Sequence, residues 1–260
     1  MGSARTRART SSLGGVPTTL VEPAVAEPRQ LALGLAPPGA PTTPFRSEVL
    51  PDVVLIRDWL PFETQRELAA QFRDWAAPPA GLRHPRVPTG HLMTVQSVCL
   101  GWHWQPYAYS RTADDTDGAP VKPLPHALAE LGRRAVVASY GDDHGFSTGF
   151  DLDAAIVNLY APGAHLGLHQ DGEEPSTAPV VTISLGDDCV FRMAGVDRRT
   201  SPFTDVVLHS GDLLVFAGVN RRIFHGVPKV LAGTAPHGLG LPPGRLSITL
   251  RETGFAHLAS

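Results

Sequence analysis

Two histidines and one aspartate in the second half of the chain have the residue types and spacing of a metal site. His169 and Asp171 are two positions apart, and His225 lies 56 positions after His169. In an extended segment, residues i and i+2 point to the same side, so His169 and Asp171 would face one ion. Two imidazoles and a carboxylate form the facial triad that holds Fe(II) with open coordination positions. Zinc accepts the same set, so the triad alone leaves iron and zinc open.

Two arginines near the C-terminal end indicate what else this site would bind. Arg245 and Arg251 are six positions apart, so on an extended strand both would point to the same side, about 20 Å apart. One could then hold the distal carboxylate of a diacid, while the other lies near the metal and Asp171. Ser247 and Thr249 alternate with apolar residues between them, which predicts one polar face and one core face. Two solvent-exposed arginines on an edge strand are the alternative.

The composition is that of a globular protein, and it limits the possible binding partners and cellular compartment. The 260 residues are 42% hydrophobic, include 26 glycines and 25 prolines, and carry a net charge of −3. Nucleic-acid binding would therefore require a local basic patch. Cys99 and Cys189 are the only cysteines, which favours a reducing compartment. No apolar run is long enough to span a bilayer. We therefore expect a cytoplasmic monomer with no membrane segment.

The chain divides into a tail and a folded region. Residues 1–45, rich in Pro, Ala, Thr and Gly, are expected to form a disordered N-terminal tail, and residues 46–255 a single domain followed by a short C-terminal tail at 256–260. Apolar spacing predicts helices over 62–77 and 124–140. Many short apolar segments separated by turn residues are typical of a sandwich or jelly roll. Strands are expected over 53–56, 155–160, 180–185, 189–193, 206–208, 213–216, 223–227 and 246–250.

A longer motif around the first two candidate ligands points to a family. Residues 158–171 read NLYAPGAHLGLHQD. This segment resembles the iron-binding signature of the AlkB family of 2-oxoglutarate-dependent nucleic-acid dioxygenases. The resemblance covers about residues 49–255 and continues through 181–186, 209–212, 224–226 and the Arg245-x5-Arg251 pair. It implies a mainly β fold with flanking helices (α+β), built on a double-stranded β-helix or jelly-roll core, with a nucleotide-recognition lid at about residues 80–122.

The resemblance also implies a role for each matched residue. Fe(II) would bind the catalytic triad His169, Asp171 and His225. 2-Oxoglutarate would contact Asn158, Tyr160, Arg245, Ser247 and Arg251, with Arg245 on its distal carboxylate. The nucleic-acid substrate would contact Met93, Trp102, Tyr107, Tyr109, Glu173 and Arg198. Trp102, in the Leu-Gly-Trp of the lid, would stack on the flipped base.

Four features depart from the family pattern. Ser247 stands where relatives often have Asn, and Gly172 stands where a basic residue can occur. The 233–244 stretch is slightly longer than in close relatives, and the lid between Trp102 and Tyr107 is slightly shorter. These departures concern the choice of lesion and strand more than the core chemistry.

The activity that the resemblance implies is oxidative demethylation of N-alkylated bases in DNA, with RNA as an alternative substrate. Fe(II) would be the cofactor and 2-oxoglutarate and O2 the co-substrates, with release of formaldehyde, succinate and CO2 in direct-reversal alkylation repair. A methyl group inside a duplex cannot reach the metal, so the base must be flipped out or the strand single. Two other functions stay open: an oxygenase acting on a protein or small molecule, and a non-catalytic binding module. The aromatic lid argues against the first, and the complete triad and arginine pair against the second.

Overall fold

Short apolar strands pair into two antiparallel sheets. The computed structural model describes residues 45–255, so the expected tails lie outside the described residues apart from Phe45. From edge to edge, the larger sheet contains β1 (Phe45–Leu50), β2 (Val53–Arg57), β11 (Leu213–Phe216), β8 (Val180–Gly186), β13 (Arg245–Arg251), β6 (Ala154–Tyr160) and β3 (Gln96–Leu100). The smaller sheet contains β10 (Thr204–Leu208), β9 (Asp188–Met193), β12 (His225–Leu231) and β7 (Leu166–His169). A separate hairpin consists of β4 (His103–Gln105) and β5 (Ala108–Ser110).

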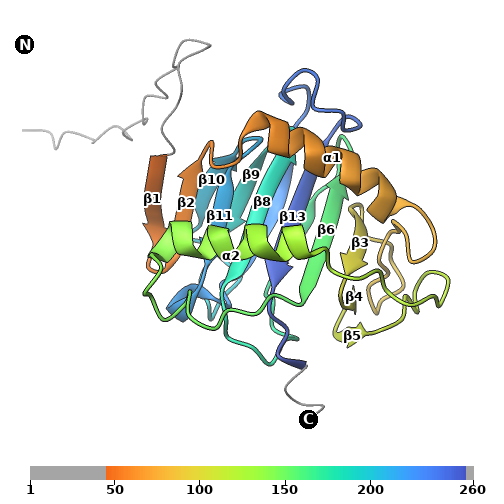
Figure 1. Cartoon of the computed structure of the whole chain (residues 1–260), viewed down its shortest axis with the longest axis horizontal. Coiled ribbons are helices and arrows are strands. Elements are labelled where there is room, and N and C mark those ends of the chain that lie inside the picture. Colours follow the sequence, from red (N-terminus) through yellow and green to blue (C-terminus); the bar gives the residue numbers. More distant parts are fainter. Residues whose placement is uncertain (1–44, 256–260) are drawn as a thin grey trace, which may run out of the picture. The chain divides into compact units, whose positions relative to one another are not determined.

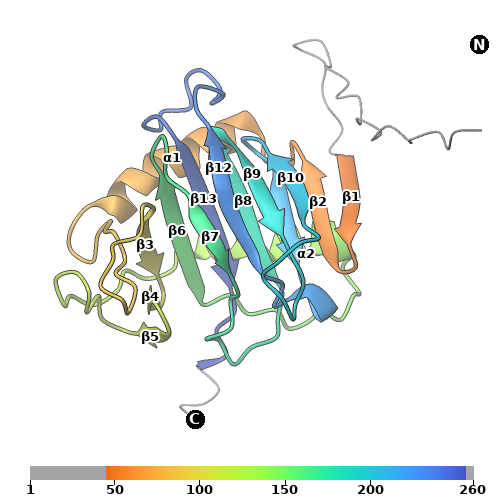
Figure 2. The same cartoon turned by 180° about the vertical axis from the view of Figure 1, so that it is seen from behind.

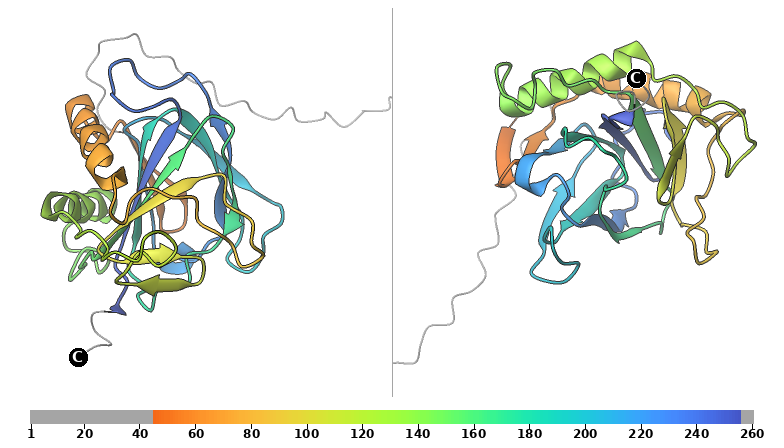
Figure 3. Two further views of the ribbon diagram at one scale, coloured as in Figure 1. Left: turned by 90° about the vertical axis from the view of Figure 1, so that its right-hand side faces the viewer. Right: turned by 90° about the horizontal axis from the view of Figure 1, so that it is seen from below.

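Two helices cover one face of the larger sheet, and the smaller sheet covers the other. Helix α1 (Phe62–Ala76) and helix α2 (His126–Tyr140) lie in front of the larger sheet in Figure 1. Figure 2 shows the smaller sheet on the opposite side. The view from below in Figure 3 shows the helices, the larger sheet and the smaller sheet as successive layers. This is the mainly β jelly roll with flanking helices that the sequence predicts.

The larger sheet separates two hydrophobic cores. Phe72 of α1 and Leu128 of α2 pack in the core under the helices, together with Leu246, Ile248 and Leu250 of β13. A second core lies between the two sheets and includes side chains of β6, β9 and β11. Because successive residues of a strand point to opposite faces, the polar residues of β13 face the space between the sheets. Strand β13 therefore serves the helix-side core with one face and a polar cavity with the other.

The two helices lie close to their predicted positions, whereas several short strands were not predicted. Helix α1 ends one residue before the predicted position, and helix α2 begins two residues after the predicted start and ends at the predicted residue. Strand β12 begins at His225, because residues 218–220 form a 3-10 turn that carries the chain on to this histidine. The strands that pattern alone did not indicate are β1, β3, β4, β5 and β7; β4 and β5 have only three residues each, too few to show a period. In the described part of the chain, no helix is long and apolar enough to cross a membrane.

Truncation of an α1 side chain tests the helix-side core. Phe72 is 4% exposed and packs against the larger sheet, so Phe72→Ala should lower the free energy of unfolding by about 3–5 kcal/mol. Gln71 is its exposed neighbour on the same helix, and Gln71→Ala should change this free energy by less than about 0.5 kcal/mol. Urea unfolding followed by circular dichroism measures both. Equal losses in the two variants would contradict the assigned helix face.

Candidate functional site

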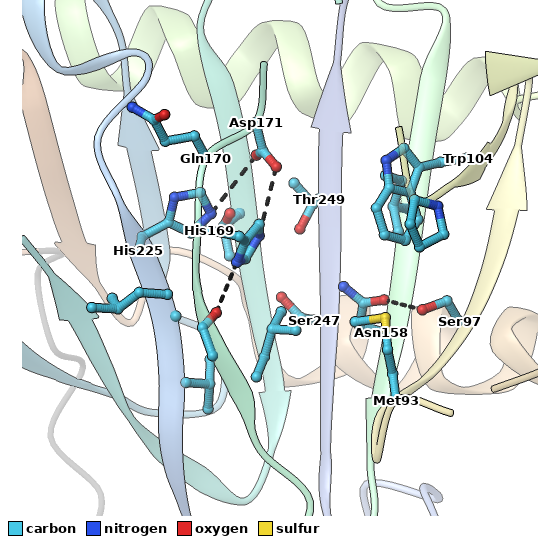
Figure 4. Close-up of a pocket in the computed structure, with 18 of the residues that line it drawn as sticks. Met93, Ser97, Trp104, Asn158, His169, Gln170, Asp171, His225, Ser247 and Thr249 are labelled. Carbon is cyan, nitrogen blue, oxygen red and sulfur yellow. Dashed lines mark hydrogen bonds and ion pairs between the residues drawn. The ribbon is translucent and has the colours of Figure 1, made fainter. Parts of the chain in front are cut away.

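A cavity of about 520 Å³ opens between the two sheets and beneath the lid. This volume lies in the range of pockets that bind small molecules. Its wall combines β6, β7, β12 and β13 with lid residues around Met93 and Trp104. Figure 4 shows the histidines and Asp171 on one side of this space, Trp104 and Met93 on the other, and β13 between them.

The three candidate metal ligands meet at one end of this cavity. His169 ends β7 and His225 begins β12, and the two are register partners in neighbouring strands of the smaller sheet. The Nε2 atom of His169 lies 3.7 Å from Oδ1 of Asp171, and Nε2 of His225 lies 3.8 Å from Oδ2 of Asp171. One ligand atom from each residue lies within 4.8 Å of the others. Three ligand atoms this close together could share one metal ion.

Backbone carbonyl groups orient both imidazole rings. Nδ1 of His169 lies 3.1 Å from the carbonyl oxygen of Gly167, and Nδ1 of His225 lies 2.9 Å from that of Ile223. With Nδ1 donating to a carbonyl, Nε2 carries the lone pair that a metal needs. Burial, and then the nearby His169, lower the pKa of His225 to about 4. His225 is therefore neutral and ready to bind a metal at pH 7.

Asp171 is a buried carboxylate that depends on Arg251. Nη2 of Arg251 lies 3.0 Å from Oδ2 of Asp171, and both side chains are less than a tenth exposed. Burial opposes ionisation, but Arg251 and then the two histidines outweigh it and hold the pKa of Asp171 well below its usual range. The carboxylate is thus charged at neutral pH, as a metal ligand must be.

Glu174 extends this ion pair toward the lid. Its carboxylate is fully buried, forms a very short ion pair with Nη1 of Arg251, and lies 3.8 Å from Nη2 of Arg221. It also accepts a hydrogen bond from the Tyr109 hydroxyl at 2.5 Å. Burial opposes ionisation, but Arg251 outweighs it and lowers the pKa of Glu174. The lid hairpin and Asp171 are therefore joined through two buried charged side chains.

Sequence reasoning did not single out Glu174 or Arg221. Arg221 donates to the backbone carbonyl groups of Asp171 and Ala178, at 3.2 and 2.6 Å, and so holds the chain where it leaves β7. The one available signal was the Glu-Glu pair that closely follows the His-Gln-Asp segment. The sequence around Arg221 does not indicate its role, because the residues that it contacts are about 45 positions away in sequence.

Arg245 has the environment of an anion-binding group. It is 1% exposed, and its guanidinium donates to the neutral hydroxyls of Ser184 at 3.0 Å and Ser247 at 3.3 Å. Its Nη1 atom is buried and has no hydrogen-bond partner within residues 45–255. An unpaired buried cation is costly, so this atom calls for an anionic ligand. A carboxylate of a diacid fits it. Both Arg245 and Arg251 are buried on an interior strand, so the exposed-edge alternative is wrong.

Tyr160 and Asn158 of β6 complete the polar wall beside Arg245. Both line the cavity. Burial raises the pKa of Tyr160 to about 12, so its phenol stays protonated and can donate a hydrogen bond. Oδ1 of Asn158 accepts a hydrogen bond from the Ser97 hydroxyl at 2.6 Å, which leaves its amide nitrogen available as a donor. The wall therefore offers several donors to an oxygen-rich ligand.

The residues expected to contact substrate fall into two groups. The first group lines the cavity and consists of Met93, Tyr107 and Glu173. Tyr107 is 75% exposed at the cavity mouth. The second group lies outside the cavity wall and consists of Trp102, Tyr109 and Arg198.

Arg198 and Tyr109 of the second group have environments other than the expected one. Arg198 is exposed on the loop after β9, while its neighbour Arg199 lines the cavity. The Tyr109 hydroxyl points inward to Glu174 rather than outward to a nucleic-acid backbone. The cavity wall therefore includes Arg199, one position beyond the expected arginine.

Comparison with known proteins gives a family match. Residues 52–251 match the model of the 2OG-Fe(II) oxygenase superfamily. The chain is 32% identical to the alpha-ketoglutarate-dependent dioxygenase AlkB of Escherichia coli, over 83% of this chain and 96% of that protein. It is also 32% identical to the DNA N(6)-methyladenine demethylase ALKBH1D of Arabidopsis thaliana, over 78% of this chain but only half of that relative's length.

A solved structure shares the fold. The structure of OsALKBH1 superposes with a TM-score of 0.72 at 31% sequence identity, covering 80% of this chain and 99% of that one. The sequence and fold comparisons thus agree with each other, and the family match over residues 52–251 includes every residue that lines the cavity and every strand except β1.

Removal of the Glu174 charge tests the buried network. Glu174→Gln leaves Arg251 without its closest partner, and breaking a buried ion pair in this way costs roughly 3–5 kcal/mol. We expect a lower melting temperature. We also expect weaker binding of Co(II), measured by the visible absorption of the ion, because Arg251 no longer orients Asp171.

Glu173→Gln is the matched control. Glu173 is adjacent in sequence but faces the cavity and is only half-buried, so this change should leave stability and Co(II) binding nearly unaltered. If Glu174→Gln bound Co(II) as tightly as the unchanged protein, Glu174 would have no part in holding the ligand aspartate.

Proposed function

Because this chain belongs to the AlkB family of the 2OG-Fe(II) oxygenase superfamily, we propose that it removes alkyl groups from the nitrogen atoms of nucleic-acid bases, in DNA or alternatively RNA. As a member of that superfamily it is an Fe(II)- and 2-oxoglutarate-dependent dioxygenase that uses O2. The proposal is supported by the Arabidopsis relative, which is a DNA N(6)-methyladenine demethylase, although the chain spans only half of that protein.

The observation that carries the proposal is an aromatic lid facing a metal triad across one cavity. Trp104 and Tyr107 of the lid line the same space as His169, Asp171 and His225. Flat bases stack on aromatic side chains, and this contact tolerates any base. A flipped base held against the lid would present an N-alkyl group toward the triad.

We assign the ligands of the iron and the co-substrate on the geometry of this chain. His169, Asp171 and His225 would hold Fe(II) through Nε2, a carboxylate oxygen and Nε2. Arg245 would bind the distal carboxylate of 2-oxoglutarate, with Ser247, Tyr160 and Asn158 beside it. When bound, iron with 2-oxoglutarate and O2 would supply the oxidation that hydroxylates an N-methyl carbon, which leaves as formaldehyde while 2-oxoglutarate becomes succinate and CO2.

The protein's own residues position and protect this chemistry. Arg251 keeps Asp171 ionised and oriented, and the carbonyl groups behind the two histidines keep their Nε2 atoms directed at the metal. The cores on either side of the larger sheet make the wall rigid, which fixes the distance between the co-substrate and the base. Specificity for the alkylated base would come from the lid side of the cavity.

Replacement of Arg245 tests the co-substrate assignment. Lysine keeps the charge but loses the planar fork that pairs with a carboxylate. Arg245→Lys should therefore raise the KM for 2-oxoglutarate about 10- to 100-fold, the value of a charged hydrogen bond, with a smaller change in kcat. Succinate formation measured by mass spectrometry gives both constants.

Arg192→Lys is the control for this variant. Arg192 pairs with Asp205 on the surface of the smaller sheet, away from the cavity, so its substitution should leave both constants unchanged. An unchanged KM in Arg245→Lys would place the co-substrate elsewhere.

A panel of alkylated oligonucleotides tests the proposed reaction. Single- and double-stranded DNA and RNA carrying 1-methyladenine, 3-methylcytosine or an etheno adduct are incubated with Fe(II), 2-oxoglutarate and air. We expect loss of the alkyl group by mass spectrometry, with formaldehyde released in step with succinate from the methylated bases and a two-carbon dialdehyde released from the etheno adduct. His169→Ala, which lacks one metal ligand, should lose at least about 100-fold in rate. Loss of a residue that only supports a ligand already lowers metal affinity or activity by about 10- to 100-fold.

Two results would overturn the proposal. If 2-oxoglutarate were consumed with a protein or small-molecule substrate while every alkylated oligonucleotide stayed intact, the chain would be an oxygenase of another substrate class. If His169→Ala kept full turnover, the triad would not be the catalytic centre.

A further inference from the structure

Trp102 is fully engaged outside the cavity. Its indole Nε1 donates to Oδ2 of Asp153 at 3.0 Å, and its ring lies 5.1 Å from that of Phe255. The guanidinium of Arg111 covers the ring at 3.6 Å from the centroid. These contacts occupy one edge and one face of the indole, with Phe255 packed at an angle beside it, and Trp102 does not line the cavity. A base could stack on the face that Arg111 covers only after that contact was broken.

The backbone at Gly101 explains this placement. Gly101 has φ of +80°, and a Cβ atom there would lie 1.9 Å from the carbonyl oxygen of Asp153. The chain therefore turns sharply against Asp153 just before Trp102 and directs its side chain that way. Strand β4 starts only at His103, so the alternation that would place Trp102 and Trp104 on one face does not hold across this turn.

Trp104 instead faces the metal side. It is the register partner of Tyr109 in the β4–β5 hairpin, and directly opposed residues share one face of a hairpin. The Tyr109 hydroxyl reaches Glu174 and Arg251, so that face is turned toward the site. Figure 4 shows the Trp104 ring across the cavity from His169 and Asp171. Within residues 45–255 its ring has no aromatic or cationic partner, unlike that of Trp102.

A buried polar cluster holds the Trp104 backbone in place. Its amide donates to Sγ of Cys99 at 3.3 Å, and its carbonyl accepts a very short hydrogen bond from Arg83. Arg83 is fixed in turn by Asp115 at 2.9 Å and by the carbonyl of Ser97 at 2.9 Å. The main chain is thus clamped while the side chain stays free to receive a ligand, which is the property of a preorganised stacking surface.

We propose that Trp104, and not Trp102, is the surface on which the flat base of the substrate stacks. Met93 and Tyr107 border this surface in the cavity wall. The proposal rests on the proposed function, because it specifies where that function's substrate base would lie. Arg83 is then a positioning residue, since it acts on the base only through the backbone of Trp104.

Matched variants of the two lid tryptophans test this assignment. The probe is a fluorescein-labelled single-stranded oligonucleotide with one 1-methyladenine, compared with the same strand carrying an abasic site there. Kd values are measured by anisotropy for the full chain with Mn(II) and 2-oxoglutarate. The Kd of the abasic strand divided by the Kd of the methylated strand reports the contribution of the base to binding. We expect Trp104→Ala to reduce this ratio about 10- to 100-fold, Trp104→Phe to reduce it less, and Trp102→Phe to change it less than threefold.

A second measurement separates loss of stacking from loss of the fold. The affinity for 2-oxoglutarate, measured by quenching of the intrinsic fluorescence, should be unchanged in all three variants, because the co-substrate lies beside Arg245 and not on the lid. A reduced ratio in Trp104→Ala with this affinity intact would support the inference. If that variant lost both, the graded loss in Trp104→Phe, which keeps a flat ring, would decide the assignment.

The outcomes separate the inference from the function on which it rests. If Trp104→Ala kept the full ratio, or if Trp102→Phe lost the preference for the base while both Trp104 variants kept it, Trp104 would not be the stacking surface. If the unchanged protein neither preferred the methylated base nor released formaldehyde from it, the proposed function itself would fail.

Discussion

The structure depends on keeping one carboxylate charged inside a protein core. Asp171 lies where burial would otherwise favour its neutral form, and Arg251 outweighs that cost at 3.0 Å. A buried arginine needs further anionic partners, which Glu174 supplies, and Glu174 in turn contacts Arg221 and Tyr109. Each buried charge in this series is stabilised by a neighbouring side chain of opposite charge. The metal-binding carboxylate therefore cannot be understood apart from side chains that never approach the metal.

This chain of contacts connects parts of the fold that are distant in sequence. Tyr109 belongs to the lid hairpin, Glu174 to the loop after β7, and Arg251 to the end of β13. The lid that would hold the base thus rests on the same ion pairs that orient Asp171. Placement of the lid and orientation of the metal ligand share one set of contacts, which gives a physical basis for coupling between base binding and the state of the site.

Much of the fold and of the candidate site follows from local pattern, and the exceptions have physical causes. The alternation along β13 predicts that Arg245 and Ser247 share one face, since strand periodicity depends only on neighbouring residues. The position of Trp102 could not be predicted, because it is set by a close approach between Gly101 and the backbone of Asp153, about 50 positions away. Glu174 was missed for a related reason: its importance comes from three partners brought together only by folding. Pattern shows which residues face inward, and tertiary contacts decide what they meet.

Strand β13 sets a limit on how such a protein can diversify. Its alternate residues serve the helix-side core and the cavity wall, so a change in packing beneath the helices would shift Arg245 and Arg251 as well. Selection for thermal robustness and selection for a new substrate would then conflict within one short strand. The side chains on the outer face of the β4–β5 hairpin, by contrast, do not belong to the helix-side core. New substrate ranges should therefore arise by changes on the outer face of the β4–β5 hairpin while the two sheets stay almost unchanged, and laboratory evolution would gain most by confining its diversity to that face.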